Sequence, residues 1–400
     1  MRFAQLQRIS IVQNVYMLAA ASIISFVAWL YLVAFRGMFW RSVPVLSPQA
    51  PFGRNKLVAI IPARNEAANI RLSIGSLLAQ NYSGELSIVL VDDHSSDGTA
   101  EIAASLATDR RLTIITGAPL PPGWSGKLWA INQGLALEKA KDADFILLTD
   151  ADIEHAPGHL SALVGKSEAD NLDLVSEMVR LNCTTKAERA LIPAFVFFFQ
   201  MLYPFAWVAD PARRLAGAAG GTMLIRRAAL DRISGVSRIH DHLIDDCALA
   251  REIKASGGTI WLGHAELAAS KRVYSRVSDV WNVIARTAYE QLGHSPLMLL
   301  GCVMAMGILY CAPPLLTLRT QGIPRALGLL SWLMMVGVFQ PTLRRYQRSP
   351  VWGFALPVIG LFYLSATVAS AMRFHSGRGG GWKDRVYPDN AETEDLSSVD

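Results

Sequence analysis

Two aspartates, one residue apart, stand at the end of an apolar run. The run Phe145–Thr149 is typical of a buried strand, and Asp150-Ala151-Asp152 follows it directly. Such continuous hydrophobicity favours a parallel strand covered on both faces, and ligands of open α/β sheets bind beyond the carboxyl ends of such strands. Carboxylates at this spacing can turn toward one Mg²⁺ or Mn²⁺ ion that also grips a phosphate. The alternative is a polar turn that only closes the strand.

Further acidic pairs stand at two other junctions between predicted elements. Asp92-Asp93 follows an apolar run, and Asp245-Asp246 precedes a helical pattern. In a doubly wound sheet the first pair lies on the same rim as the two acids described above. Clustered carboxylates repel one another, so they require a cation, a donor-rich ligand or a shared proton. A nucleotide diphosphate with a divalent metal meets these requirements, and a later carboxylate can act as general base toward an acceptor hydroxyl.

Three polar residues near predicted strand ends are further candidates for substrate binding. Lys127 follows a glycine-rich turn, where its ammonium can meet a phosphate or simply begin a helix. Arg64 and Glu66 follow the first predicted strand, where they can face a substrate or form a surface ion pair of little energetic weight.

The elements that must position these residues alternate between strand and helix. Short apolar runs predict strands at residues 57–62, 86–91, 112–115, 145–149, 172–182, 222–225 and 260–262, with helical patterns between several of them. This alternation predicts an α/β fold built on a doubly wound, mostly parallel sheet.

The composition indicates a membrane protein with a substantial aqueous part. Hydrophobic residues make up 52% of the chain and charged residues only 18%, and the apolar excess gathers near the N-terminus and in the last quarter. The runs 15–35, 297–318, 323–340 and 351–372 each approach the ~20 residues that cross a bilayer. The run 191–208 contains two prolines, so we expect an interfacial or re-entrant helix rather than a span. The net charge of +5 favours an anionic lipid surface over nucleic acid.

Basic residues divide the chain relative to the membrane. More of them follow the first apolar run than precede it, so the positive-inside rule predicts that the middle of the chain is cytoplasmic. We expect an anchor and linker at 1–55, an α/β domain at 56–290, further spans at 291–375 and a polar tail at 376–400. Alternation of the spans places the C-terminus outside, whereas the basic residues after the last span favour the inside.

The order of these motifs resembles that of family 2 glycosyltransferases of the GT-A fold. The resemblance covers about residues 56–290 and is carried by segments 58–66, 91–99, 149–152 and 245–246. With segment 126–130 and the flanking spans, the chain looks most like the hopene-associated members of bacterial hopanoid biosynthesis, and more distantly like ceramide glucosyltransferases. This resemblance implies a multi-pass enzyme of the bacterial inner membrane with a cytoplasmic catalytic domain. It also implies inverting transfer of a sugar from a nucleotide-sugar donor to a lipid acceptor.

The resemblance implies roles for individual residues as well. Residues at the strand ends would contact the donor: Pro62, Ala63, Arg64, Glu66, Asp92, Asp93, Lys127 and Asp150. Asp150 and Asp152 would bind Mg²⁺ or Mn²⁺, and Asp246, beside Asp245, would deprotonate the acceptor. The Q/RxxRW motif of processive members is reduced here to Arg286, which we retain as a substrate contact. Arg272, Arg276 and Arg286 could each neutralise phosphate or face lipid headgroups, and for Arg272 and Arg276 we favour contacts to headgroups.

Rival functions follow from the same residues. Sugar transfer to polyprenyl phosphate or another glycolipid fits the motifs, whereas the incomplete Q/RxxRW motif and the few spans count against a polysaccharide synthase. A non-catalytic nucleotide-binding membrane scaffold is the alternative outside the enzyme class. The spans carry almost no charged residues, which counts against a transporter.

Overall fold

The computed structural model describes residues 2–377, 381–382 and 385–386, and the chain forms two compact units. The first unit consists of Met1–Ser42, Cys183–Pro204 and Ser275–Met372, and the second of Val43–Asn182, Phe205–Tyr274 and Arg373–Asp400. The segment Cys183–Pro204 thus belongs to the first unit although it lies within the range 56–290. The division into 1–55, 56–290, 291–375 and 376–400 stays a prediction.

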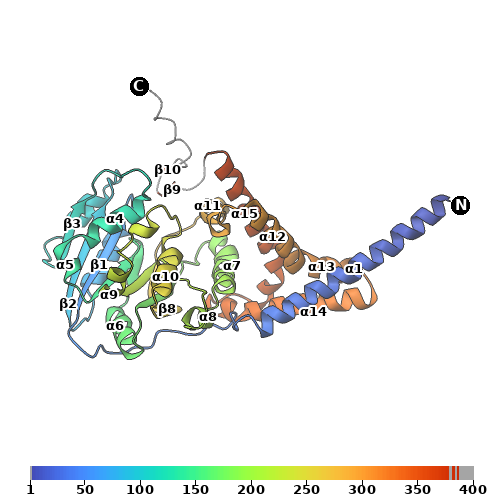
Figure 1. The fold of residues 1–400 in the computed structure, drawn as a ribbon, viewed down its shortest axis with the longest axis horizontal. Coiled ribbons are helices and arrows are strands. Elements are labelled where there is room, and N and C mark those ends of the chain that lie inside the picture. The colour runs from blue at the N-terminus through green and yellow to red at the C-terminus, as the bar shows by residue number, and fades with distance from the viewer. Residues whose placement is uncertain (1, 378–380, 383–384, 387–400) are drawn as a thin grey trace, which may run out of the picture. The chain divides into compact units, whose positions relative to one another are not determined.

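A mixed sheet of eight strands forms the centre of the second unit (Figure 1). In spatial order the strands are β3 (Leu112–Thr116), β2 (Glu85–Asp92), β1 (Lys56–Ala63), β4 (Phe145–Thr149), β7 (Thr222–Arg226), β6 (Leu174–Arg180), β8 (Ile260–Ser270) and β5 (Ile153–His155). The first four run parallel, β7 is antiparallel to both neighbours, β6 and β8 are parallel, and β5 is antiparallel to β8. The predicted α/β fold is confirmed. Strand β5 has only three residues, too few to produce a periodic signal in the sequence.

The carboxyl ends of the parallel strands meet at one edge of the sheet. Ala63 at the end of β1 pairs with Asp92 at the end of β2, and the N–H of Asp93 donates to the carbonyl of Ala63 at 2.8 Å. Because β7 runs antiparallel to β4, it begins at this same edge, where Thr222 pairs with Thr149. Residues that lie far apart in the sequence are therefore brought to one rim, the usual place for ligands in such sheets.

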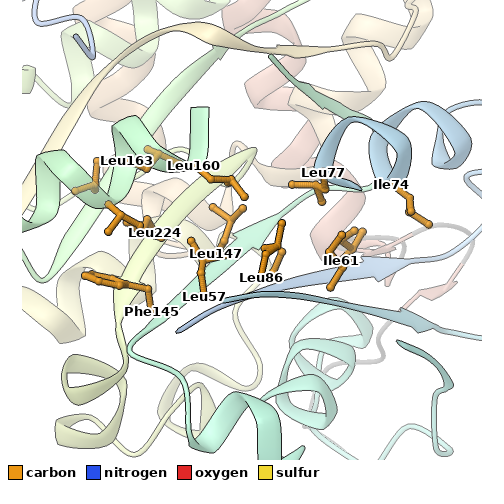
Figure 2. Close-up of a cluster of buried hydrophobic side chains, with 14 of the residues drawn as sticks. Leu57, Ile61, Ile74, Leu77, Leu86, Phe145, Leu147, Leu160, Leu163 and Leu224 are labelled. Carbon is orange, nitrogen blue, oxygen red and sulfur yellow. The ribbon is translucent and has the colours of Figure 1, made fainter. Parts of the chain in front are cut away.

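Helices cover the sheet of the second unit. They are α2 (Ile70–Leu78), α3 (Thr99–Ala104), α4 (Gly126–Leu135), α5 (Glu138–Lys141), α6 (His159–Ala169), α8 (Phe205–Ala209), α9 (Arg227–Arg232) and α10 (Asp245–Ala255). Figure 2 shows Leu77 of α2 and Leu160 of α6 facing Ile61 and Leu147 of the strands. Each such side chain, buried almost completely, stabilises the fold by about 1.5–3 kcal/mol.

The opposite face of β1 packs against α4. Strand residues alternate in direction, so Ile60 points away from the cluster of Figure 2 and toward this helix. A Cβ on Gly134 of α4 would lie 2.7 Å from Cγ2 of Ile60, so only glycine allows this close approach. The contact holds α4 against β1 and thereby fixes Lys127 near its N-terminus.

The first unit is helical. Its helices are α1 (Arg2–Ala34), α7 (Lys186–Leu202), α11 (Val277–Thr287), α12 (Pro296–Met306), α13 (Ala312–Arg319), α14 (Gly322–Arg345) and α15 (Leu356–His375). The indole N–H of Trp29 donates to the carbonyl of Leu309 at 2.8 Å, and the ring meets Tyr310 edge-on. These contacts join α1 to the π-helical turn Gly307–Cys311 that links α12 to α13.

Five helical stretches of the described residues are long and apolar enough to cross a membrane: Tyr16–Ala34, Lys186–Ala209, Pro296–Arg319, Gly322–Arg345 and Pro350–His375. Four of them coincide with the spans expected from the sequence. The fifth contains the 191–208 run, in which α7 ends at Leu202 and α8 begins at Phe205, directly after Pro204. Pro193 lies within α7. The expected polar tail falls mostly outside the described residues, which include the short paired strands β9 (Gly381–Trp382) and β10 (Arg385–Val386).

Candidate active site

Lys127 joins two of the acidic segments predicted from the sequence. It is the second residue of α4, and its Nζ lies 2.9 Å from Oδ1 of Asp150 and 3.1 Å from Oδ2 of Asp245. Burial lowers the pKa of Lys127, but the charges of Asp150 and Asp245 outweigh burial and leave the pKa above its ordinary value. Lys127 is therefore a cation that neutralises carboxylates at the end of β4 and at the start of α10.

The carboxylate of Asp246 lies near Lys127 and accepts hydrogen bonds from two backbone N–H groups. Its Oδ2 accepts from the N–H of Gly220 at 2.7 Å, and its Oδ1 accepts from the N–H of Cys247 at 2.7 Å. Burial and the neighbouring Asp245 raise the pKa of Asp246 to about 6, although Lys127 and the two N–H groups oppose them. A half-buried carboxylate with raised proton affinity is suited to accept a proton near neutral pH.

Gly220 is placed where Asp246 and Lys127 meet the sheet. It comes shortly before β7, and a Cβ at this position would lie 3.2 Å from Oδ2 of Asp246 and 3.4 Å from Nζ of Lys127. The absence of a side chain therefore lets both groups approach the backbone. Sequence reasoning did not assign Gly220 to the site, although a Gly-Gly pair before a short strand is a signal of close backbone approach.

Asp152 forms an ion pair with a second cation, the guanidinium of Arg272. Its Oδ2 accepts from Nε of Arg272 at 2.8 Å and from the hydroxyl of Ser270 at 3.1 Å. Arg272 also donates to the carboxylate of Glu66, and both Asp152 and Glu66 are buried. Burial raises the pKa of Asp152 more than Arg272 lowers it. The pKa of Arg272 lies above its ordinary value, since the two carboxylates outweigh the effect of burial.

The interpretation of Arg272 as a lipid-headgroup contact is therefore wrong. The guanidinium pairs with two acids of the site because β8 runs on to Ser270, eight residues beyond the predicted strand end at Leu262. The sequence offered no signal for this role, since the length of β8 is set by its pairing with β6 and β5. Arg276, by contrast, lies at the start of α11, where its N–H donates to Asp279.

Several of the residues predicted to contact the donor gather at the ends of β1 and β2. Pro62 and Ala63 are buried, and NH1 of Arg64 donates to the carbonyl of Asp93 at 2.5 Å and lies 3.5 Å from its Oδ2. Oδ2 of Asp92 accepts from the N–H of Ser95 at 3.2 Å, whereas its Oδ1 is buried without a hydrogen-bond partner among the described residues. Arg64 and Glu66 thus pair with site residues rather than forming a surface ion pair.

Arg286 is the one predicted site residue that belongs to the other compact unit. It lies in α11 with an exposed side chain, whereas the remaining predicted residues share the second unit. Its contact with substrate stays a prediction.

The acids do not form a metal site by themselves. Within the parts of the chain that the structure describes, no three His, Cys, Asp or Glu side chains are grouped to hold an ion. Asp150 and Asp152 contact Lys127 and Arg272 respectively. Mg²⁺ is commonly held by one or two carboxylates together with substrate phosphates. The two acids therefore fit a cation whose coordination a diphosphate completes.

Part of this chain matches a known protein family. Residues 58–234 match the family described as Glycosyl transferase family 2. The chain is 24% identical over 234 residues to a probable glycosyltransferase, YdaM, of Bacillus subtilis. This alignment covers 57% of this chain and 52% of the relative. The chain is 25% identical over 249 residues to a beta-monoglucosyldiacylglycerol synthase of Trichormus variabilis, covering 57% and 51%. The chain thus spans about half the length of these curated relatives.

A solved structure has the same fold. The mannosyltransferase PcManGT of Pyrobaculum calidifontis, determined in complex with GDP-Man and Mn²⁺, is similar over 89% of this chain and 98% of that chain, with a TM-score of 0.53 and 19% identity. The family match includes the ends of β1, β2 and β4 and the Gly220 segment, whereas α10 with Asp246 follows it. Residues 58–234 of this chain are thus similar to Glycosyl transferase family 2, and the chain has the GT-A fold.

Proposed function

We propose that this protein is a membrane-associated glycosyltransferase that moves a sugar, with inversion, from a nucleotide-sugar donor to a hydroxyl group of a lipid. The observation that carries the proposal is the meeting of Asp150, Lys127 and Asp246 around Gly220. Lys127 is a cation suited to bind a phosphate, and Asp246 is a carboxylate with a raised pKa. They come from separate segments of the sequence and lie at the same edge of the sheet. Five apolar helices and the similarity to a glucosyldiacylglycerol synthase support a lipid acceptor.

Asp246 and Lys127 have different roles in the proposed reaction. Asp246 accepts the proton of the acceptor hydroxyl while the acceptor oxygen bonds to the anomeric carbon from the face opposite the diphosphate. The bond from that carbon to the diphosphate oxygen breaks in the same step, so the configuration inverts and the nucleoside diphosphate leaves. Lys127 stabilises the charge that develops on the leaving phosphate. Asp150 and Asp152 would hold a Mg²⁺ or Mn²⁺ ion, and this ion would neutralise further charge on the diphosphate.

The acceptor we propose is a hopanoid, in a bacterial inner membrane with the catalytic domain on the cytoplasmic side. Support for it is the resemblance of segment 126–130 and of the motif order to the hopene-associated members of the family. Diacylglycerol is the second candidate, favoured by the similarity to a synthase whose name describes a glucosylated diacylglycerol.

Transfer assays distinguish these acceptors. Detergent-purified protein is incubated with each nucleotide sugar and with either a hydroxylated hopanoid or diacylglycerol, and the glycolipid and released nucleotide are quantified. We expect one lipid product whose anomeric configuration is opposite to that of the donor. Absence of turnover with every donor, in protein that stays folded and lipid-bound, would favour the non-catalytic scaffold. Lipid profiling of a deletion strain then identifies the natural product.

Asp152→Ala tests the metal proposal. We expect the affinity for nucleotide sugar in the presence of Mn²⁺ to fall about 10- to 100-fold, while the weaker metal-free binding changes little. Donor titrations with and without Mn²⁺ measure this difference. Glu154→Ala is the matched control, because Glu154 lies two residues away in an exposed ion pair with Lys271. Unchanged metal dependence in Asp152→Ala would leave Asp152 only as the partner of Arg272.

Gly220→Ala tests the close approach at the centre of the site. The added methyl group displaces the Asp246 carboxylate or the Lys127 ammonium by a few tenths of an ångström, and we expect the transfer rate to fall about 10-fold. Gly75→Ala in α2 is the control, since no atom beyond its own helix lies within 4 Å of the new Cβ. Equal rates for the two variants would show that Gly220 has no role in positioning.

A further inference from the structure

A chain of buried polar side chains lies behind the turn that carries Asp150 and Asp152. Thr149, His155, His159 and Glu177 are each no more than 2% exposed. Thr149 Oγ1 lies 3.1 Å from His155 Nε2, His155 Nδ1 lies 2.9 Å from His159 Nδ1, and His159 Nε2 lies 2.6 Å from Glu177 Oε2. Burial of so many polar groups is costly unless they are joined, and the proposed chemistry uses none of them directly.

The hydroxyl of Thr149 determines the direction of this chain. It lies 2.8 Å from the carbonyl oxygen of Gly221, which can only accept, so the single hydroxyl proton points there. His155 Nε2 must then donate to Thr149, and His155 Nδ1 accepts from His159 Nδ1. His159 Nε2 is left as an acceptor for a proton of Glu177. Each heavy-atom contact thus contains one proton, and all the donors point the same way.

This arrangement leaves every member of the chain uncharged. Burial lowers the pKa of His159 to about 3, and burial together with His159 lowers the pKa of His155 well below its ordinary value. Neither ring is therefore an imidazolium at neutral pH. A neutral His159 whose Nδ1 donates to His155 has a lone pair on Nε2, so its 2.6 Å contact with Glu177 then requires a proton on the carboxyl group. An ionised Glu177 beside a protonated His159 has the same number of protons, but the low pKa of His159 disfavours it.

The row of hydrogen bonds ends at the backbone of Gly221, next to both the 150–152 turn and Asp246. Thr149 ends β4 just before the turn that carries Asp150 and Asp152, and His155 ends β5 just after it, so their hydrogen bond joins the two strands that flank the turn. Gly221 accepts from Thr149, and the preceding Gly220 donates to Asp246. One Gly-Gly pair is thus in contact with the turn on one side and with the proposed base on the other.

We propose that the chain from Glu177 through His159, His155 and Thr149 to Gly221 is a positioning element that holds the 150–152 turn in place relative to Asp246. The role in positioning rests on the proposed function, whereas the direction of the hydrogen bonds does not. The physical need is plain, since donor diphosphate and base come from separate segments and misplacement by about 1 Å can lower a rate about 10²-fold.

Thr149 offers a matched pair of variants. Thr149→Val keeps the shape and removes the hydroxyl, whereas Thr149→Ser keeps the hydroxyl and removes a methyl group. We expect kcat to fall about 10-fold in Thr149→Val, with a smaller change in donor KM, and to stay close to wild type in Thr149→Ser. Thermal unfolding midpoints and nucleotide affinities of both variants show whether the fold is kept. Equal kcat values in the two variants overturn the positioning role.

Glu177 tests the charge and direction of the chain. The amide of Glu177→Gln can donate to His159 as the carboxylic acid does, so we expect it to retain most of kcat, whereas Glu177→Leu cannot donate and loses activity. Ring ¹⁵N chemical shifts of the wild-type histidines are expected to show His155 protonated on Nε2 and His159 on Nδ1, with His159→Gln used for assignment. The opposite tautomers, or equal losses in both Glu177 variants, overturn the proposal.

Failure of the proposed function gives a different result. A folded wild-type protein that transfers no sugar refutes the function and the positioning role together. An active wild-type protein with the opposite histidine tautomers, or with equal rates in both Thr149 variants, refutes the positioning role alone.

Discussion

Asp246→Asn is expected to lower the rate of sugar transfer about 10²- to 10⁴-fold while the nucleotide donor still binds. The amide cannot take the proton of the acceptor hydroxyl. The amide oxygen can accept from only one of the two N–H groups that now bind the carboxylate, so the variant can lose stability. The thermal unfolding midpoint is therefore measured together with kcat and donor affinity. Asp241→Asn makes the same change at an exposed position five residues earlier and is expected to have little effect. Retained turnover in Asp246→Asn would rule out Asp246 as the base.

The pH dependence of the wild-type enzyme supports or opposes the same assignment. Burial and Asp245 raise the pKa of Asp246 to about 6, so the base is protonated below this pH and ionised above it. We therefore expect kcat/KM to rise with pH up to about 6 and then to level off, because this ratio reports groups of the free enzyme. The residual activity of Asp246→Asn should lack this rise. A profile with no acidic limb near pH 6 would contradict the assignment.

Lys127→Met is expected to lower kcat about 10²- to 10³-fold and to weaken donor binding. Methionine keeps most of the length of the side chain but removes the charge that faces Asp150 and Asp245. Asp150 and Asp245 are then left without this cation, and a leaving phosphate loses a positive charge that would stabilise it. Steady-state kinetics and donor titration measure the two effects. Lys141→Met is the control, because Lys141 forms an exposed pair with Glu138 that contributes little.

A double variant separates two roles of Lys127. The reference is the Asp150→Asn single variant, which lacks one proposed metal ligand and is expected to be slow by itself. If the lysine only balances the charge of Asp150, the double variant Lys127→Met with Asp150→Asn should transfer sugar at the rate of Asp150→Asn. If the lysine binds the donor phosphate, the double variant should be slower than Asp150→Asn, so equal rates would exclude the phosphate role.

Several elements of the site could be predicted from the residues alone. The apolar runs that became β1, β2 and β4 are unbroken because both of their faces are covered, and this pattern is local. The acids Asp92 and Asp150 follow those runs directly, so their place at the carboxyl edge followed from the strands. The helices that are long and apolar enough to cross a membrane were equally evident, since such a stretch needs no tertiary context to be recognised.

The partners of these acids were decided by the tertiary structure. Lys127 and Asp245 are 118 residues apart, and they meet because β7 inserts antiparallel beside β4 and places the Gly220 segment at the carboxyl edge. Arg272 reaches Asp152 because pairing with β6 and β5 extends β8 well beyond its apolar start. His155 lies in a strand of three residues whose existence depends on that same pairing. Periodicity in a sequence reports which face of an element is buried, whereas the order and length of strands depend on contacts between distant segments. The sequence therefore determined which acids stand at the sheet edge, and only the fold decided which cations and backbone groups bind them.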